Sequence, residues 1–194
     1  MKKILSMCLT AAFAGTLMTG CSAITEMFEK ANGVILYGDH NQVAEVFEQE
    51  KDDLKEKSEY KFKVAEDHGQ QILIFNETTA KALVEKELLN EVVKDDETEP
   101  ISSLPELKDK GILFTKEDDV NKVIIDGHLL SVSNEGNIVI GRGRNYGDMF
   151  LVVSDDKWSA MKGTEKSMGV IEYNKDPAKK LPEFEVEKVQ LITI

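Results

Sequence analysis

The chain's three histidines are its most evident candidates for metal binding, because each has an aspartate close by. His40 and His68 each directly follow an aspartate, and His128 is two residues after a third aspartate. Imidazole and carboxylate together can hold Zn²⁺, but no two histidines have the spacing that would place both on one helix face. The sequence therefore predicts no metal site and no cofactor, and these pairs are typical of turns.

The sequence contains no recognisable motif for nucleophilic catalysis. A Gly-x-Ser-x-Gly turn is absent, and nothing links a particular serine to a particular histidine. The acidic runs at 95–97 and 117–119 lack the alternating oxygen ligands and central glycine of a calcium loop, so we expect solvated loops there. The pattern favours a protein that is not an enzyme.

The segment 141–148 is the most distinctive candidate site. It holds three glycines together with Arg142 and Arg144, which are the chain's only arginines. Glycines allow backbone N–H groups to converge on an anion, and arginine binds carboxylates and phosphates through two parallel hydrogen bonds. We predict that Arg142 and Arg144 contact a partner or an anion. The alternative is a loop that joins two strands, with both arginines paired to nearby carboxylates.

The N-terminus has the pattern of an export signal. Lys2 and Lys3 precede an apolar run over residues 4–18. At about 1.5 Å per residue, a helix of fifteen residues is too short for roughly 30 Å of hydrocarbon, so a cleaved signal is favoured over a permanent span.

The segment 17–21, Leu-Met-Thr-Gly-Cys, resembles the lipobox of bacterial lipoproteins, although Met18 stands where that family usually has leucine. The resemblance implies cleavage by signal peptidase II after residue 20 and a lipid, diacylglyceryl and palmitate, on Cys21. The only other cysteine, Cys8, lies within the removed segment, so the mature chain would have no disulfide, thiolate nucleophile or cysteine-bound zinc.

Composition restricts the partners of the mature chain. The formal charge of the whole chain is −12, and removing residues 1–20 with their two lysines makes it −14. Nucleic acid needs clustered cations and is not expected to bind. Anionic headgroups would repel such a domain, so the lipid rather than surface charge is expected to hold it to the membrane.

We expect three parts: a signal peptide at 1–20, a lipidated cysteine with a short tether at 21–32, and one extracytoplasmic domain at 33–194. The eleven residues after Cys21 reach at most about 35 Å, which would keep the domain close to the bilayer. On a helix, Ile24, Met27, Phe28 and Ala31 would form one apolar face. That face would dock on the domain or dip into the headgroup region.

The domain divides into a helical part and a strand-rich part. The apolar spacing predicts a strand at 33–37, a helix at 41–57, a hairpin of 60–64 and 71–75, and a second helix from Asn76 to Val92. A short helix is expected at 103–111, where Ser103 and Glu106 have capping-box spacing. Strands are predicted at 120–125, 128–133, 137–140, 149–153, 168–173 and 186–194.

These elements predict an α+β fold. Asp126 and Gly127 form the strongest hairpin signal, and successive tight turns favour antiparallel pairing. We expect an antiparallel sheet, rich in meanders in its C-terminal half, with the two main helices packed on one face.

One further local resemblance concerns residues 150–158, Phe-Leu-Val-Val-Ser-Asp-Asp-Lys-Trp, together with 169–173, Gly-Val-Ile-Glu-Tyr. This pattern is similar to one in the extracellular domains of some FtsX-like ABC permeases. The resemblance implies a position beside a membrane complex and carries no catalytic or ligand residue.

The working hypothesis is a membrane-anchored, non-enzymatic binding or accessory module on the extracytoplasmic face, next to a membrane protein complex. A ligand-binding receptor for a transporter and an envelope hydrolase with an unfamiliar site are the alternatives. In a two-membrane bacterium, Ser22 after the lipidated cysteine would direct the protein to the outer membrane.

Overall fold

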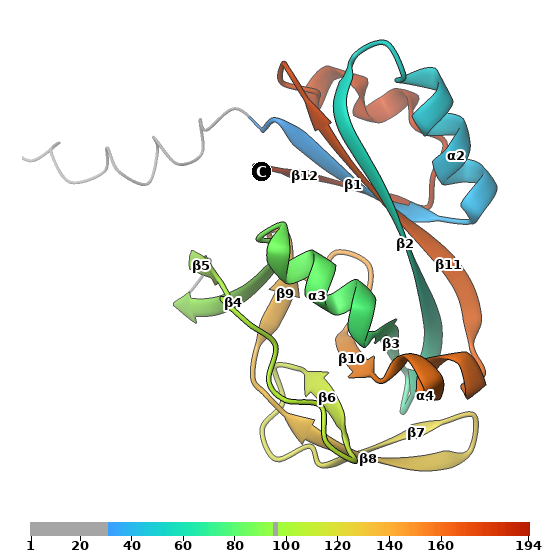
Figure 1. Cartoon of the computed structure of the whole chain (residues 1–194), viewed down its shortest axis with the longest axis vertical. Helices are drawn as coiled ribbons and strands as arrows, with labels where there is room; N and C mark the ends of the chain where they lie inside the picture. Colours follow the sequence, from blue (N-terminus) through green and yellow to red (C-terminus); the bar gives the residue numbers. More distant parts are fainter. Residues whose placement is uncertain (1–30, 95–96) are drawn as a thin grey trace, which may run out of the picture. The chain divides into compact units, whose positions relative to one another are not determined.

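The computed structural model describes residues 31–94 and 97–194, whose backbone is dominated by strands (Figure 1). One sheet has nine strands in the order β12-β1-β11-β2-β3-β10-β6-β8-β7, and a second has three in the order β5-β4-β9. The strands of the larger sheet are β1 (Gly33–Gly38), β2 (Leu54–Asp67), β3 (Gln70–Asn76), β6 (Gly111–Phe114), β7 (Lys122–Ile125), β8 (His128–Asn134), β10 (Met149–Val153), β11 (Thr164–Tyr173) and β12 (Lys188–Ile192). The smaller sheet contains β4 (Leu89–Lys94), β5 (Glu97–Pro100) and β9 (Ile138–Ile140).

Within 31–94 and 97–194, three α-helices and one short 3₁₀ helix accompany these strands. They are α2 (His40–Gln49), α3 (Glu77–Glu85), α4 (Asp155–Ala160) and η1 (Ala178–Glu183). The α+β class is confirmed, and most neighbouring strands are antiparallel as predicted. Two pairs differ, because β3 with β10 and β6 with β8 run parallel.

The two main helices pack on opposite faces of the large sheet, so the prediction of one shared face was wrong. Val43, Val46 and Phe47 of α2 cluster with Val34 and Leu36 of β1. The intervening residues of β1 point to the other face, since successive side chains alternate. There they join the cluster that contains α3 and lies between the two sheets. Figure 1 shows α2 beside β1 and β11, and α3 beside β3 and β10.

Both helices are shorter than their apolar spacing predicts. After α2 the chain turns at residues 51–53, and Leu54 begins β2. After α3, Glu87 adopts a left-handed backbone with φ of 56°. The Leu88 N–H donates to the Leu83 carbonyl and the Glu87 N–H to that of Val84, which is a Schellman ending. The β-branched pair Val92 and Val93 then belongs to β4.

Other local predictions had mixed outcomes. The hairpin at Asp126 and Gly127 is confirmed, and both residues have the positive φ that a two-residue turn of this type requires. Residues 103–110 are not helical, so the expected short helix was wrong.

The segment that resembles a permease pattern contains the end of β10 and α4. The Ser154 side chain accepts a hydrogen bond from the Lys157 N–H and so caps α4, a helix that was not predicted from the sequence. The Trp158 indole N–H donates to the Ile74 carbonyl at 2.9 Å and fixes α4 against β3. Ser154 and Trp158 thus have structural roles within this domain. The resemblance to the permease domains stays a prediction.

Candidate functional site

Arg144 lies within the fold, although it belongs to the segment predicted to contact a partner. Its Nε and Nη2 donate to the Asn137 side chain at 3.3 and 3.0 Å, and Nη2 also donates to the Ile138 carbonyl at 2.9 Å. Its Nη1 donates to the carbonyls of Phe114 at 3.2 Å and Asp148 at 2.8 Å. These bonds use all five N–H donors of a guanidinium.

The surroundings of this guanidinium are also apolar. Its carbon lies 4.9 Å from the centre of the Phe150 ring. Burial disfavours the charged form and lowers the pKa of Arg144 to about 10, which the nearby Asp148 carboxylate partly opposes. The geometry therefore supports the structural alternative for Arg144, with backbone carbonyls in place of the expected carboxylates.

Arg142 points elsewhere. Its side chain is exposed, and Nη2 donates to the Thr193 hydroxyl at 2.7 Å near the C-terminus. The two arginines thus do not converge on one ligand. Two of the loop's glycines are explained by close packing, since a Cβ at Gly147 would lie 2.6 Å from Leu73 and one at Gly141 would lie 2.9 Å from Gln190.

Tyr146 of the same loop was not predicted as a contact residue. Its ring stacks on Tyr37 with centroids 4.8 Å apart, and its hydroxyl donates to the Glu187 carboxylate. Burial, followed by the hydrogen bond to Glu187, raises the pKa of Tyr146. The loop is therefore a packed connection between β1, β9, β10 and the segment before β12.

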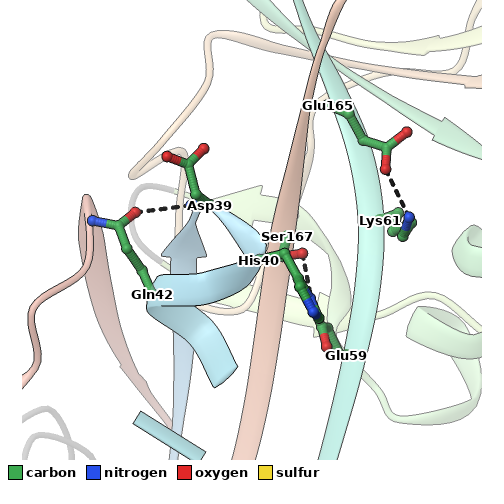
Figure 2. A network of polar contacts seen from close by, with 7 residues as sticks. All are labelled: Asp39, His40, Gln42, Glu59, Lys61, Glu165 and Ser167. Atoms are coloured by element: carbon green, nitrogen blue, oxygen red, sulfur yellow. Dashed lines mark hydrogen bonds and ion pairs between the residues drawn. The ribbon is translucent and has the colours of Figure 1, made fainter. Parts of the chain in front are cut away.

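A polar cluster lies where the start of α2 meets β2 and β11 (Figure 2). Glu59 Oε1 lies 2.6 Å from His40 Nδ1 and accepts a hydrogen bond of 2.7 Å from the Ser167 hydroxyl. Because Ser167 donates to Glu59 and not to His40, the imidazole is not placed to take the serine proton. This arrangement joins three elements and does not have the geometry of a serine nucleophile.

Lysines complete the network around this cluster. Lys61 pairs with Glu165 at 2.7 Å, while Lys166 contacts Asp39 at 2.8 Å and Glu187 at 2.5 Å. The hydrogen bonds to Asp39 and then Glu187 raise the pKa of Lys166. Figure 2 also shows the Gln42 side chain, which accepts from the Asp39 N–H at the start of α2.

The histidines do not share a site. His40 belongs to the polar cluster, His68 lies 3.6 Å from Asp67 in the β2–β3 turn, and His128 begins β8. Within 31–94 and 97–194, no group of three or more His, Cys, Asp or Glu side chains is arranged to hold a metal ion.

A groove between the β7–β8 hairpin and α4 is the feature best suited to hold a partner. Its volume is about 370 Å³, and its lining is mainly apolar, with Leu129, Leu130 and Met161 beside Lys157 and Lys162. Volumes of this size are typical of binding pockets, although this one is open. Figure 1 shows the hairpin and α4 next to each other.

Two apolar side chains of the hairpin are exposed together. Leu129 and Ile124 are directly opposite each other in the β7–β8 pair and are 63% and 38% exposed. The sequence could have indicated an exposed leucine here, because Leu129 and Leu130 are adjacent in one predicted strand. Because side chains alternate between the faces, one of two adjacent leucines must lie on the outer face.

One backbone donor on the outer edge of β7 is occupied. The Ile124 N–H donates to the Asp67 carboxylate at 3.1 Å, at the end of β2. An unpaired edge invites pairing with another strand, and a carboxylate there prevents it. The Ile124 N–H is therefore not free to pair with another strand, and the exposed pair offers its apolar side chains.

The predicted signal peptide at 1–20, the lipidation site Cys21 and all but the last two residues of the predicted tether at 21–32 lie outside the described residues. Within the described part of the chain, none of the helices is sufficiently long and apolar to span a membrane.

Comparison with known proteins gives two matches that agree with each other. Residues 31–194 match the model of a family described as "Uncharacterised lipoprotein family". The fold is similar to a 1.5 Å crystal structure described as a "Putative Lipoprotein from Bacillus anthracis". That chain is 33% identical, with a TM-score of 0.77, and the match covers 84% of this chain and 98% of the other. No curated protein matches the chain.

Proposed function

The chain belongs to an uncharacterised lipoprotein family, and from this premise we propose that it is a lipid-anchored, extracytoplasmic binding or accessory module. The lipid would be attached to Cys21, and the partner would be a protein of a membrane complex. In this proposal the β7–β8 hairpin and the groove beside α4 form the contact surface.

The observation that carries the proposal is the exposed pair of Ile124 and Leu129. Large apolar side chains gathered beside an apolar groove mark a surface for another molecule more often than single exposed residues do. Burying each of them against a partner would contribute roughly 1 to 2 kcal/mol, according to the area removed from water.

The position of this pair in the sheet fits a module held at its N-terminal end. The anchor would lead into β1, the second strand of the sheet, whereas β8 is the eighth. Six strand spacings separate them, which is about 29 Å measured along the sheet. The contact surface would therefore lie far from β1 in the strand order of the sheet.

Affinity capture tests the proposal. The full-length lipidated chain would be recovered from detergent-solubilised membranes after mild crosslinking, with the Cys21→Ala variant as the control for membrane attachment. We expect a specific membrane protein to be recovered with the wild-type chain and much less of it with the variant. Repeated recovery of no specific protein would contradict the proposed function.

A further inference from the structure

The groove carries positive charge in a strongly acidic chain. The formal charge of the sequence is −12, yet the groove lining includes Lys157 and Lys162 and a single carboxylate, Asp126. Lys162 pairs with Asp126 at 2.9 Å. Lys157 donates to the backbone carbonyl of Asp109 at 2.6 Å, and a carbonyl does not neutralise its charge.

The charged and apolar parts of the groove are close together. Leu129, Leu130, Met161 and both lysines line the same space, and α4 supplies Lys157 one turn before its C-terminal end. An occupant that buries an apolar side chain there brings its neighbouring groups up to the lysines. Carboxylates at those positions would gain opposite charges, whereas lysine or arginine would be repelled.

We propose that the groove binds a peptide segment of another envelope protein in which an apolar side chain is flanked by carboxylates. This inference rests on the proposed function and specifies the chemistry of its partner. The apolar side chain packs on Leu129 and Met161, and a flanking carboxylate pairs with Lys157.

Carbodiimide crosslinking in membranes tests this pairing, since the reagent joins a lysine to a carboxylate only when the two groups are in contact. Cells that make the full-length chain would be treated, and the crosslinked peptides would be identified by mass spectrometry. The amide between Lys162 and Asp126 provides an internal control for reactivity, because that pair exists within the chain. We expect a second amide that joins Lys157 to an aspartate or glutamate of another protein, next to an apolar residue.

Four variants, two of them controls, distinguish the apolar contact from the charged one. Leu129→Ser should reduce recovery of that protein about tenfold, because it replaces the apolar contact with a small polar side chain. Val93→Ser is the matched control, because Val93 is also an exposed apolar strand residue, at 46%, but lies in β4 of the other sheet. Lys157→Glu should reduce recovery, whereas Lys157→Arg keeps the charge and should retain it.

Each outcome has a defined meaning. Recovery of a partner that Leu129→Ser and Lys157→Glu leave unchanged would overturn this inference while leaving the proposed function intact. Crosslinks from Lys157 only to copies of this chain would also overturn it. So would binding to vesicles of anionic phospholipid that depends on Leu129, since the occupant would then be a lipid surface. Recovery of no partner at all would remove the proposed function as well.

Discussion

All five N–H donors of the Arg144 guanidinium bind acceptors within the domain, so this arginine has a structural role. The acceptors are the Asn137 side chain and the carbonyls of Phe114, Ile138 and Asp148. Carbonyls occur in every residue, so no sequence pattern reveals which arginine they will surround. The sequence could predict that the loop at 141–148 was special, but not that one arginine faced inward and the other outward.

Replacement of the two arginines should therefore have unequal effects on stability. Arg144→Ala removes the donor from several acceptors, most of them partly buried, and should lower the free energy of unfolding by about 1 to 3 kcal/mol. Arg142→Ala removes an exposed side chain and should change it by less than about 0.5 kcal/mol. Urea denaturation of both variants measures the difference. Equal, small effects would mean that the hydrogen bonds of Arg144 do not persist in solution.

At the scale of elements, the sequence predicted where α2 and α3 begin but not where they end, and it did not predict α4 or the strands β4, β5 and β6. Asn76 caps α3 as expected, and its side chain accepts from the Thr79 N–H at 2.7 Å. The end of α3 is set at Glu87, a residue with no evident preference for the left-handed backbone it adopts. The apolar spacing continued past that point, because residues of β4 also face the core between the sheets.

The contact between α2 and β11 depends on a glycine. A Cβ at Gly169 would lie 2.7 Å from Val43 and 3.1 Å from the Phe47 ring, so the helix would have to move away from the strand. Gly169→Ala should therefore lower the free energy of unfolding by about 1 to 3 kcal/mol, as overpacking typically does. Gly143→Ala is the control, because its Cβ would have no neighbour closer than 3.9 Å. Thermal unfolding of both variants would show a loss for Gly169 alone, and equal losses would contradict this packing.

For the whole molecule, strands β3 and β10 lack alternation because both of their faces are covered, one by the cluster that contains α3 and the other by the β7–β8 hairpin and α4. Strand β10 is buried at every position and contains only apolar residues, which is typical of a strand covered on both sides. The apolar stripe of each helix showed that it packs on a sheet, but it could not indicate which face. That choice depends on contacts between distant segments, such as β1 with β11 and β12.

Buried tyrosines make the fold sensitive to alkaline pH. Burial is the largest cause that raises the pKa of Tyr37, Tyr146 and Tyr173 above the ordinary value of 10.0. A raised pKa in the folded state adds stability that is present below pH 10 and is lost as the pH rises above it. For fully buried Tyr37 the loss is up to about 1.4 kcal/mol per pH unit. Arg144, whose pKa is lowered, acts in the opposite direction but is a single group.

Tyrosinate absorbance and circular dichroism, followed together as the pH is raised from 9, check this expectation. Most of the tyrosinate signal should appear in the same step as the loss of secondary structure. Full, reversible ionisation near pH 10 in a chain that stays folded would contradict the burial of these hydroxyls.

The central claim is that the domain is held to a membrane by a lipid on Cys21, and detergent-phase partitioning tests it most directly. The wild-type chain and the Cys21→Ala variant would be expressed in bacteria, and each would be partitioned between aqueous and detergent phases. The wild-type chain should enter the detergent phase, and the variant should remain in the aqueous phase or keep an uncleaved signal of higher mass. A mature-sized variant that enters the detergent phase as wild type does would contradict lipid attachment at this cysteine.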